Sequence, residues 1–347
     1  MKLPSRRWLI AGAVFAALLI VAGSLTVADG PRTSAAPTRI TIKATPITSF
    51  DSRDPSRTSF GALEFRGGLA LTSAYEPFGG VSAIDVEPDG SHFLAITDNG
   101  SWLRGRIVYQ DGKPAGIAEA AMAPILGEDD KPLASRGWFD VEALTELGGM
   151  FYIGIERVEK IVRFDYRRDG LLARGEPIAV PAEFSTFTFN KSLECLASGP
   201  DGSPLAGNLI VITERSLDSA GNHRSFILKP GAGEHAARFS VKRSDDFDVS
   251  DCTILPPNDL LLLERRYSPA RGVAMRIRRI PLEEIKPGAL VDGKPLIEAD
   301  LAFQIDNMEG IAVHRDAGGE TVITLVSDDN FSVLQRNLLL QFTLIGD

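Results

Sequence analysis

A short hairpin plan recurs five times along the chain, and this repeat limits the folds available to it. Each copy has a polar or acidic residue, a short apolar strand, a turn, a second apolar strand and a closing acidic residue. The copies start at Ser82, Glu142, Glu194, Asp251 and Glu309. Further apolar strands follow the hairpins, for example at 160–166 and 274–280. Three or four strands at a period of 52 to 60 residues predict the blades of a β-propeller.

The two ends of the repeated region also have strand character. Residues 39–48 and 60–72 alternate as strands but lack the hairpin plan, and residues 338–344 form a final apolar strand. Pairing of N- and C-terminal strands within one blade would close the ring and remove exposed edges. We therefore expect an all-β propeller over residues 39–347, with six blades favoured and five as the alternative.

The first 28 residues have the three parts of a secretory signal. Lys2, Arg6 and Arg7 precede an apolar stretch at 9–27 that ends in small residues. The arginine pair within 5–9 is similar to a twin-arginine export signal. The apolar stretch is also long enough to remain as an anchor in the inner membrane. Residues 29–38 are predicted to be a flexible tether, so we expect a periplasmic or secreted domain whose membrane contact is limited to that possible anchor.

Charge and composition exclude several classes of function. The formal net charge is −9, and residues 1–28 carry three basic and no acidic side chains, so the remainder is near −12. An acidic surface repels phosphate backbones and argues against a nucleic-acid partner. No Gly-x-Ser-x-Gly motif is present, and none of the four His takes a position that the repeat defines, so a Ser-His-Asp triad is not expected. Cys195 and Cys252 take the same place in adjacent repeats and are expected to be small packing residues rather than a disulfide or a nucleophile.

The acidic residues of the hairpins are the main candidates for a site. In an antiparallel hairpin the start of the first strand lies beside the end of the second, so these acids should face one mouth of the central channel. Crowded carboxylates need a cation, and an oxygen-only ligand set favours Ca²⁺, with Mg²⁺ as the alternative. The competing interpretation is that the acids are solvated strand ends. The candidate metal ligands are Asp98, Glu142, Glu156, Glu194, Glu214, Asp251, Glu264, Glu309 and Asp328.

Basic and amide side chains stand next to these acids. An arginine follows the closing acid in three repeats, and other polar residues lie close to the strand starts. Such groups could bind an anionic small-molecule substrate. The candidates are Arg157, Arg215, Arg265, Lys191 and Asn307. The sequence singles out no catalytic base.

Several motifs in order resemble a known family. They are Gly79-Gly-Val-Ser-Ala-Ile84, Glu142-Ala-Leu-Thr145, Asn190-Lys-Ser-Leu-Glu194, Asn307-Met-Glu-Gly-Ile-Ala-Val313 and Ser327-Asp-Asp-Asn330. Together they resemble the phytase-like family, whose members are described by an "esterase-like activity of phytase", over about residues 55–345. The resemblance implies export, hydrolysis of phosphoesters or esters, and acidic site positions. The matching acids are Glu142, Glu194, Glu309 and Asp328, with Glu156 and Glu214 in Glu-Arg pairs, whereas Ser82 and Asp251 depart from a Glu at the strand start.

These observations lead to one expected function and two alternatives. We expect an exported, metal-dependent hydrolase of phosphate esters that uses Ca²⁺. One alternative is a propeller lactonase or carboxylester hydrolase with a central divalent ion. The other is a non-catalytic propeller that binds a ligand or a protein. Several basic side chains around the carboxylates would favour a phosphate, and few would favour a neutral lactone.

Overall fold

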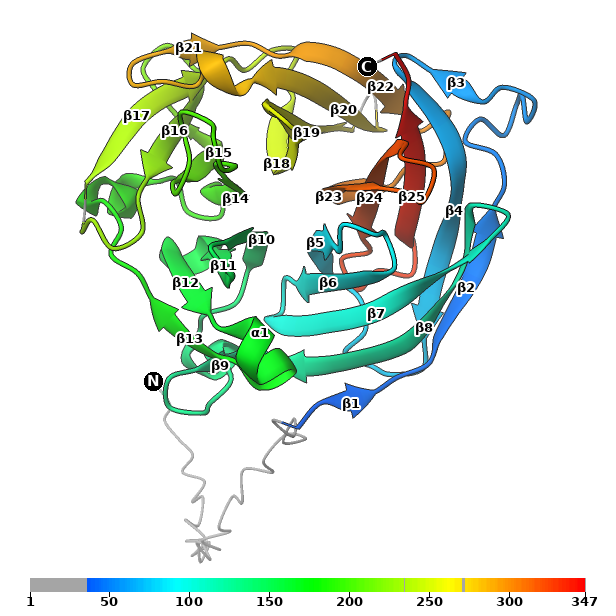
Figure 1. Ribbon diagram of the computed structural model, residues 1–347, viewed down its shortest axis with the longest axis horizontal. Helices are drawn as coiled ribbons and strands as arrows, with labels where there is room; N and C mark the ends of the chain where they lie inside the picture. The colour runs from blue at the N-terminus through cyan, green and yellow to red at the C-terminus, as the bar shows by residue number, and fades with distance from the viewer. Residues whose placement is uncertain (1–35, 234, 270–271, 347) are drawn as a thin grey trace, which may run out of the picture. The chain divides into compact units, whose positions relative to one another are not determined.

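The computed structural model describes residues 36–233, 235–269 and 272–346. These residues form five sheets arranged around a central axis (Figure 1). The fold is therefore a five-bladed β-propeller, which matches the alternative blade number and not the favoured six. The predicted signal or anchor at 1–28, and the tether up to residue 35, lie outside the described residues. Within the described part, no helix is both long and apolar enough to cross a membrane.

Each blade contains four to six strands. From the channel outwards, the first blade contains β5 (Val81–Val86), β6 (His92–Thr97), β7 (Ser101–Gln110), β8 (Lys113–Pro124) and β1 (Thr38–Arg39). In the same direction, the second contains β10 (Val141–Leu147), β11 (Met150–Ile155), β12 (Lys160–Phe164), β13 (Arg174–Pro177) and β9 (Leu126–Gly127). The third contains β14 (Leu193–Ser198), β15 (Leu209–Leu217), β16 (His223–Leu228), β17 (Ala236–Val241) and β21 (Leu290–Val291).

The last two blades complete the ring. The fourth contains β18 (Asp248–Leu255), β19 (Asp259–Ser268), β20 (Gly272–Pro281) and β22 (Lys294–Asp300). The fifth contains β23 (Asn307–Arg315), β24 (Thr321–Asp328), β25 (Asn337–Leu344), β4 (Leu63–Ser73) and β2 (Ile42–Ile47), with β3 (Ser59–Phe60) paired to β4. The five repeated hairpins thus supply the innermost strands, as the sequence predicted.

Strands from both ends of the propeller share the fifth blade. The C-terminal β25 pairs antiparallel with the N-terminal β4, for example Leu339 opposite Leu69. Strand β2 then covers β4, whereas β1 pairs with β8 of the first blade. The predicted closure by N- and C-terminal strands is confirmed. The flanking strands join existing blades, and for this reason they do not build a sixth.

The apolar core lies between neighbouring blades. Because each blade packs on both sides, its strands are buried on both faces and read as continuous apolar runs. In β19, Leu260, Leu261, Leu262 and Leu263 are all fully buried. Between the first two blades, Trp102 packs edge-on against Phe164 at 5.2 Å between ring centres. This packing fixes each inner strand against its neighbours around the channel.

A disulfide joins two neighbouring inner strands. Cys195 in β14 and Cys252 in β18 are both buried, with their Cα atoms 5.2 Å apart, and their sulfur atoms are bonded. The expectation of two separate packing residues was wrong. Equal positions in adjacent repeats bring the two Cα atoms within the range that a disulfide spans, because adjacent inner strands pack directly side by side.

Candidate metal and substrate site at one mouth of the channel

All five inner hairpins contain a β-bulge at the same place. In each, the pairing between the first and second strand skips one residue of the first strand. A bulge re-aims the side chain of the extra residue, here at the end of the strand next to the channel mouth. The bulged residues are Ser82, Glu142, Glu194, Ser250 and Glu309.

The second strand of each hairpin supplies a partner position beside the bulge. The residue just before the bulge pairs with a residue of the second strand. The partner position is the next residue along that second strand. It is occupied by Asp98, Glu156, Glu214, Arg265 and Asp328. We call these five residues and the five bulged residues the acidic ring. Seven of its ten members are carboxylates, and the others are Ser82, Ser250 and Arg265.

The two serines of the acidic ring link blades instead of adding charge. The Ser82 hydroxyl donates to the carbonyl of Val141 at 2.6 Å, and the Ser250 hydroxyl donates to the carbonyl of Met308 at 3.0 Å. Each acceptor directly precedes the bulged glutamate of the next blade. The serines therefore hold the strand ends that present Glu142 and Glu309.

Two predicted ligands lie one position out of register. The sequence repeat in the fourth blade was aligned on Asp251 and Glu264, but the ring positions there are Ser250 and Arg265. Because alternate residues of a strand point to opposite faces, an offset of one residue moves a side chain to the other face. Asp251 accepts a hydrogen bond from the backbone of Ile311 at 2.8 Å. Glu264 lies buried within its own blade against two arginines, away from the carboxylate cluster.

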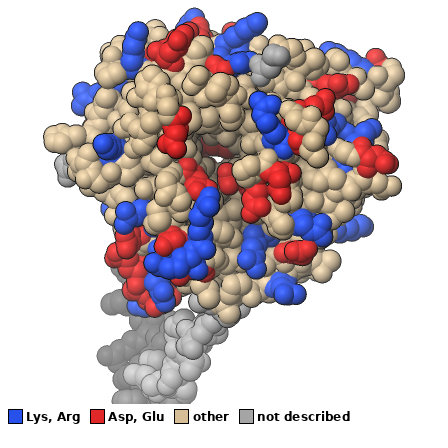
Figure 2. Space-filling view, in the orientation of Figure 1, with Lys and Arg blue, Asp and Glu red and all other residues tan. Residues whose placement is uncertain are grey.

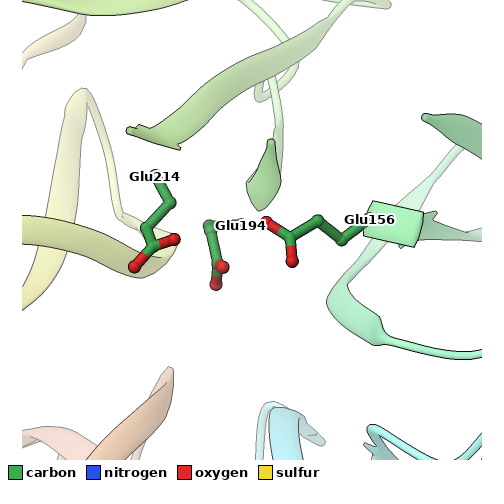
Figure 3. Close-up of side chains that lie close together, drawn as sticks. All are labelled: Glu156, Glu194 and Glu214. Atoms are coloured by element: carbon green, nitrogen blue, oxygen red, sulfur yellow. The ribbon is translucent and has the colours of Figure 1, made fainter. Parts of the chain in front are cut away.

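Three carboxylates of the ring form a tight cluster. One oxygen each from Glu156, Glu194 and Glu214 lies within 4.8 Å of the other two, and all three side chains are buried. Figure 3 shows them converging from two neighbouring blades. Calcium binds oxygen at roughly 2.3–2.6 Å, so ligands on opposite sides of one ion lie about 5 Å apart. The spacing and the oxygen-only donor set fit such an ion.

Several carboxyl pKa values in the ring are raised by burial and by neighbouring negative charges. Burial raises the pKa of Glu194 well above its ordinary value, and the charges of Glu156 and Glu214 add to the effect. Burial also raises the pKa of Glu142 in the same way, with Glu309 as its largest contributing charge. The pKa of Glu156 rises to about 7, and that of Glu309 to about 8, again mainly through burial. Burial is the main cause of these shifts, and the neighbouring carboxylates raise the pKa values of Glu194 and Glu142 further.

The remaining two acids lie on the side of the first and fifth blades. Burial raises the pKa of Asp98 to about 7, helped by the charge of Asp328. The pKa of Asp328 rises to about 6, mainly through burial. Each of these carboxylates accepts a backbone hydrogen bond at 2.6 Å, from Asn99 and Asn330 respectively. A single side of the channel mouth therefore carries two further oxygen donors.

Two cations already contact the ring. Arg265 lies 3.2 Å from Glu309 and 3.7 Å from Glu214, and it donates to Asn307 at 3.2 Å. Lys191 lies 2.6 Å from Glu214 and is partly exposed. The second carboxylate oxygen of Glu309, Oε2, is buried without a hydrogen-bond partner. The two cations thus leave at least one buried carboxylate oxygen of the ring without a hydrogen bond.

The other two arginines predicted to bind the substrate, Arg157 and Arg215, lie in different environments. Arg157 is exposed and stacks on Phe139 at 4.2 Å from the ring centre, with Phe189 at 5.4 Å, so its guanidinium stays open to a ligand. Arg215 instead donates to the buried Asp248 at 2.9 Å, a partner that the repeat pattern did not indicate. The structure therefore leaves Arg157 more open to an anion than Arg215, which is held by a carboxylate.

The raised carboxyl pKa values predict how stability depends on pH in the absence of metal. A folded pKa above the unfolded value means that the folded state binds more protons, so stability falls as pH rises towards the folded pKa. Burial lowers the pKa of His223 to about 4, which acts in the opposite direction, but only below about pH 6.5. In EDTA, the melting temperature should therefore fall between pH 6.5 and 8, and Asp98→Asn should make the fall shallower. Each pKa unit corresponds to about 1.4 kcal/mol.

Thermal melts of both proteins across this pH range check the prediction. A wild-type melting temperature that stays level or rises from pH 6.5 to 8 would show that the ring carboxylates are not held in a raised-pKa state.

The fold and the ring together define a class: a five-bladed propeller with a carboxylate-lined mouth. The family model described as "Phytase-like: Esterase-like activity of phytase" matches residues 76–331. The chain belongs to this family, as its motifs indicated. The match covers all five inner hairpins and every member of the acidic ring. No curated protein matches the sequence significantly.

Several solved structures align with this chain at low sequence identity. An endo-arabinase from Bacteroides thetaiotaomicron is 12% identical, with 83% of this chain and 98% of that chain covered and a TM-score of 0.45. A glutaminyl cyclase from Myxococcus xanthus is 12% identical, with 78% and 92% covered and a TM-score of 0.41. The PQQ-bound aldose sugar dehydrogenase from Streptomyces coelicolor is 15% identical, with 90% and 99% covered and a TM-score of 0.38. These values carry no argument about activity.

Proposed function

We propose that this protein is a metal-dependent hydrolase of phosphate esters whose site is the acidic ring. The observation that carries the proposal is the convergence of buried carboxylate oxygens from Glu156, Glu194 and Glu214 within 4.8 Å. Buried like charges repel strongly unless a cation lies among them. Family membership supports hydrolysis as the type of reaction.

The donor set selects the kind of ion. All candidate ligands are carboxylate oxygens, which suits Ca²⁺ and also admits Mg²⁺. Glu156, Glu194 and Glu214 would hold the ion, with Glu142 and Glu309 beside them. A bound divalent ion polarises a phosphoryl oxygen and lowers the pKa of a coordinated water.

The basic side chains favour a phosphate over a neutral ester. Arg265 and Lys191 contact the ring carboxylates, and Arg157 follows the ring residue Glu156. Guanidinium groups bind phosphate through paired hydrogen bonds, and a lysine adds a point charge. These residues would bind and orient the anionic group, and the amide of Asn307, 2.7 Å from Glu309, would help to fix that carboxylate.

We also propose that the domain works outside the cytoplasm. Residues 1–28 have the pattern of a secretory signal. The disulfide between Cys195 and Cys252 supports the same location, because such bonds persist in oxidising compartments. A fusion of residues 1–38 to a reporter that is active only after export should be active, and a reporter retained in the cytoplasm would contradict export.

Calcium binding and hydrolysis test the function together. A ligand that binds only the folded state stabilises it by about 2.7 kcal/mol at a hundredfold excess over its dissociation constant. Calcium added to metal-free protein should therefore raise the melting temperature, and the double substitution Glu194→Gln with Glu309→Gln should abolish that rise. Release of nitrophenol from nitrophenyl phosphate should fall at least tenfold in the same variant, because the lost charges hold the ion.

An exposed glutamate provides the matched control. Glu64 lies exposed on the outer strand β4, so Glu64→Gln should leave both the calcium response and the hydrolysis unchanged. If the double variant retains both properties, the ring acids are only solvated strand ends. Hydrolysis of lactones without any activity on phosphate esters would replace the proposed substrate class by the lactonase alternative.

A further inference from the structure

A second cavity lies at the opposite end of the inner strands. Its volume is about 520 Å³, and all five inner strands line it. Apolar side chains form much of its wall, including Ile84, Leu144, Ile254 and Val313. Within β10, the ring residue Glu142 and the cavity residue Glu146 are four positions apart, which is roughly 13 Å along a strand. The cavity is therefore separate from the acidic ring, and we call it the far cavity.

One carboxylate in the far cavity has no partner. Asp85 of β5 lines the cavity, and among the described residues nothing forms a hydrogen bond or ion pair with its side chain. Burial raises its pKa to about 7, and the charges of Glu146 and Glu87 add to the rise. By contrast, Glu146 is bound by Arg167 at 2.7 and 3.0 Å. Asp85 therefore leaves one negative charge unbalanced against an apolar wall.

A buried histidine beside the far cavity supplies no positive charge. His314 of β23 lines the far cavity with only 5% of its surface exposed, and its Nδ1 has no hydrogen-bond partner. Burial lowers its pKa, so its ring is neutral near pH 7 and does not balance Asp85. Hydroxyl groups of Thr145, Thr253 and Ser198 supply further hydrogen-bonding points. These hydroxyl groups can bind the polar part of a ligand.

The cations near the far cavity are engaged elsewhere. Arg167 is held by Glu146, and Arg315 is exposed and donates to the carbonyl of Gly319 at 2.9 Å. Figure 2 shows both acidic and basic side chains around the opening at the centre of the ring, while the charged residues that line the cavity are Asp85, Glu146 and Arg315. The balance of charge facing the cavity is therefore negative, which attracts cations and repels phosphate.

We infer that the far cavity is a second small-molecule site, which binds organic ammonium ions with an apolar body. The ammonium group would donate to Asp85, and the hydrocarbon or aromatic part would pack against Ile84, Leu144 and Val313. The volume of the far cavity lies within the range of cavities that hold small organic ligands. Such sites usually have an apolar wall that contains a few polar groups, as this cavity does. The inference is independent of the chemistry at the acidic ring.

Titration of the intact protein with benzylammonium at pH 8 tests this site. Calorimetry should show saturable binding to the wild type, and Asp85→Asn should weaken it about ten- to hundredfold, as expected for loss of a charged hydrogen bond. Benzyl alcohol, which has the same ring and no charge, should bind at least tenfold more weakly than benzylammonium to the wild type. Glu87→Gln is the matched control, because Glu87 is exposed and does not line the far cavity, so its loss should change binding little.

Three results would overturn the inference: no saturable binding, equal binding of benzyl alcohol and benzylammonium, or full binding by Asp85→Asn. The substitution should not unfold the protein, since it removes a charge that burial already disfavours. The calcium response should persist in Asp85→Asn, which separates failure at the far cavity from failure at the acidic ring.

Discussion

Replacing Glu264 by Gln should lower the free energy of unfolding by about 3–5 kcal/mol. Glu264 is fully buried and accepts hydrogen bonds from Arg276 and Arg278, which are themselves almost fully buried. The four donor–acceptor distances lie between 2.7 and 3.2 Å. Gln keeps the shape of the side chain but leaves two buried guanidinium groups without their shared carboxylate. Urea unfolding of the two proteins measures the difference.

A second ion pair of the same blade gives the comparison. Asp259 pairs with Arg279 at 2.7 Å, but both side chains are partly exposed. Asp259→Asn should cost at most about 1 kcal/mol, because water screens such pairs. If Glu264→Gln costs no more than Asp259→Asn, the buried carboxylate does not balance the two arginines, and its burial has another cause.

Removing the disulfide should have an effect of similar size. The two cysteines are 57 positions apart, and a crosslink over a loop of that length restricts the unfolded chain by about 4 kcal/mol. The variant Cys195→Ala with Cys252→Ala should therefore unfold at a clearly lower urea concentration than the oxidised wild type. Alanine fills the buried positions without adding a polar group.

Reductant supplies the control for this second prediction. Dithiothreitol should lower the unfolding midpoint of the wild type towards that of the variant and leave the variant unchanged. Equal midpoints for oxidised and reduced wild-type protein would show that the bridge does not constrain the unfolded chain.

The hairpin repeat was sufficient to predict the propeller but not its blade number. Short apolar runs define each inner strand locally, and the starts at Glu142 and Glu194 lie one blade apart. Whether β2 and β4 build a blade of their own depends on long-range pairing. That pairing, such as Leu69 with Leu339, leaves no mark in the local pattern. The strands at the ends and their pairing within one blade were therefore predicted, while their place in the fifth blade, without a sixth, had to come from the structure.

The acidic ring was predicted in part, and its errors have a common source. Glu142, Glu156, Glu194, Glu214 and Glu309 were identified because an acid recurs at both ends of the hairpin. In the fourth blade the bulge falls on Ser250, one residue before Asp251, and this shift puts Arg265 where Glu264 was expected. A bulge changes register by one residue without a signature in composition. The disulfide was missed for a related reason, because the sequence of a single hairpin does not reveal the distance between two blades.

The pairing of β4 with β25 has a consequence for how the protein reaches its native state. Leu69 meets Leu339 about 270 positions later in the chain. Compared with a loop of about 57 residues, closing so long a loop adds only about 1.4 kcal/mol of entropy, but non-local pairing of this kind slows folding. Glu309 and Asp328 both belong to the blade that this pairing completes. The complete ring of carboxylates therefore depends on a pairing between the earliest and the latest strands of the propeller.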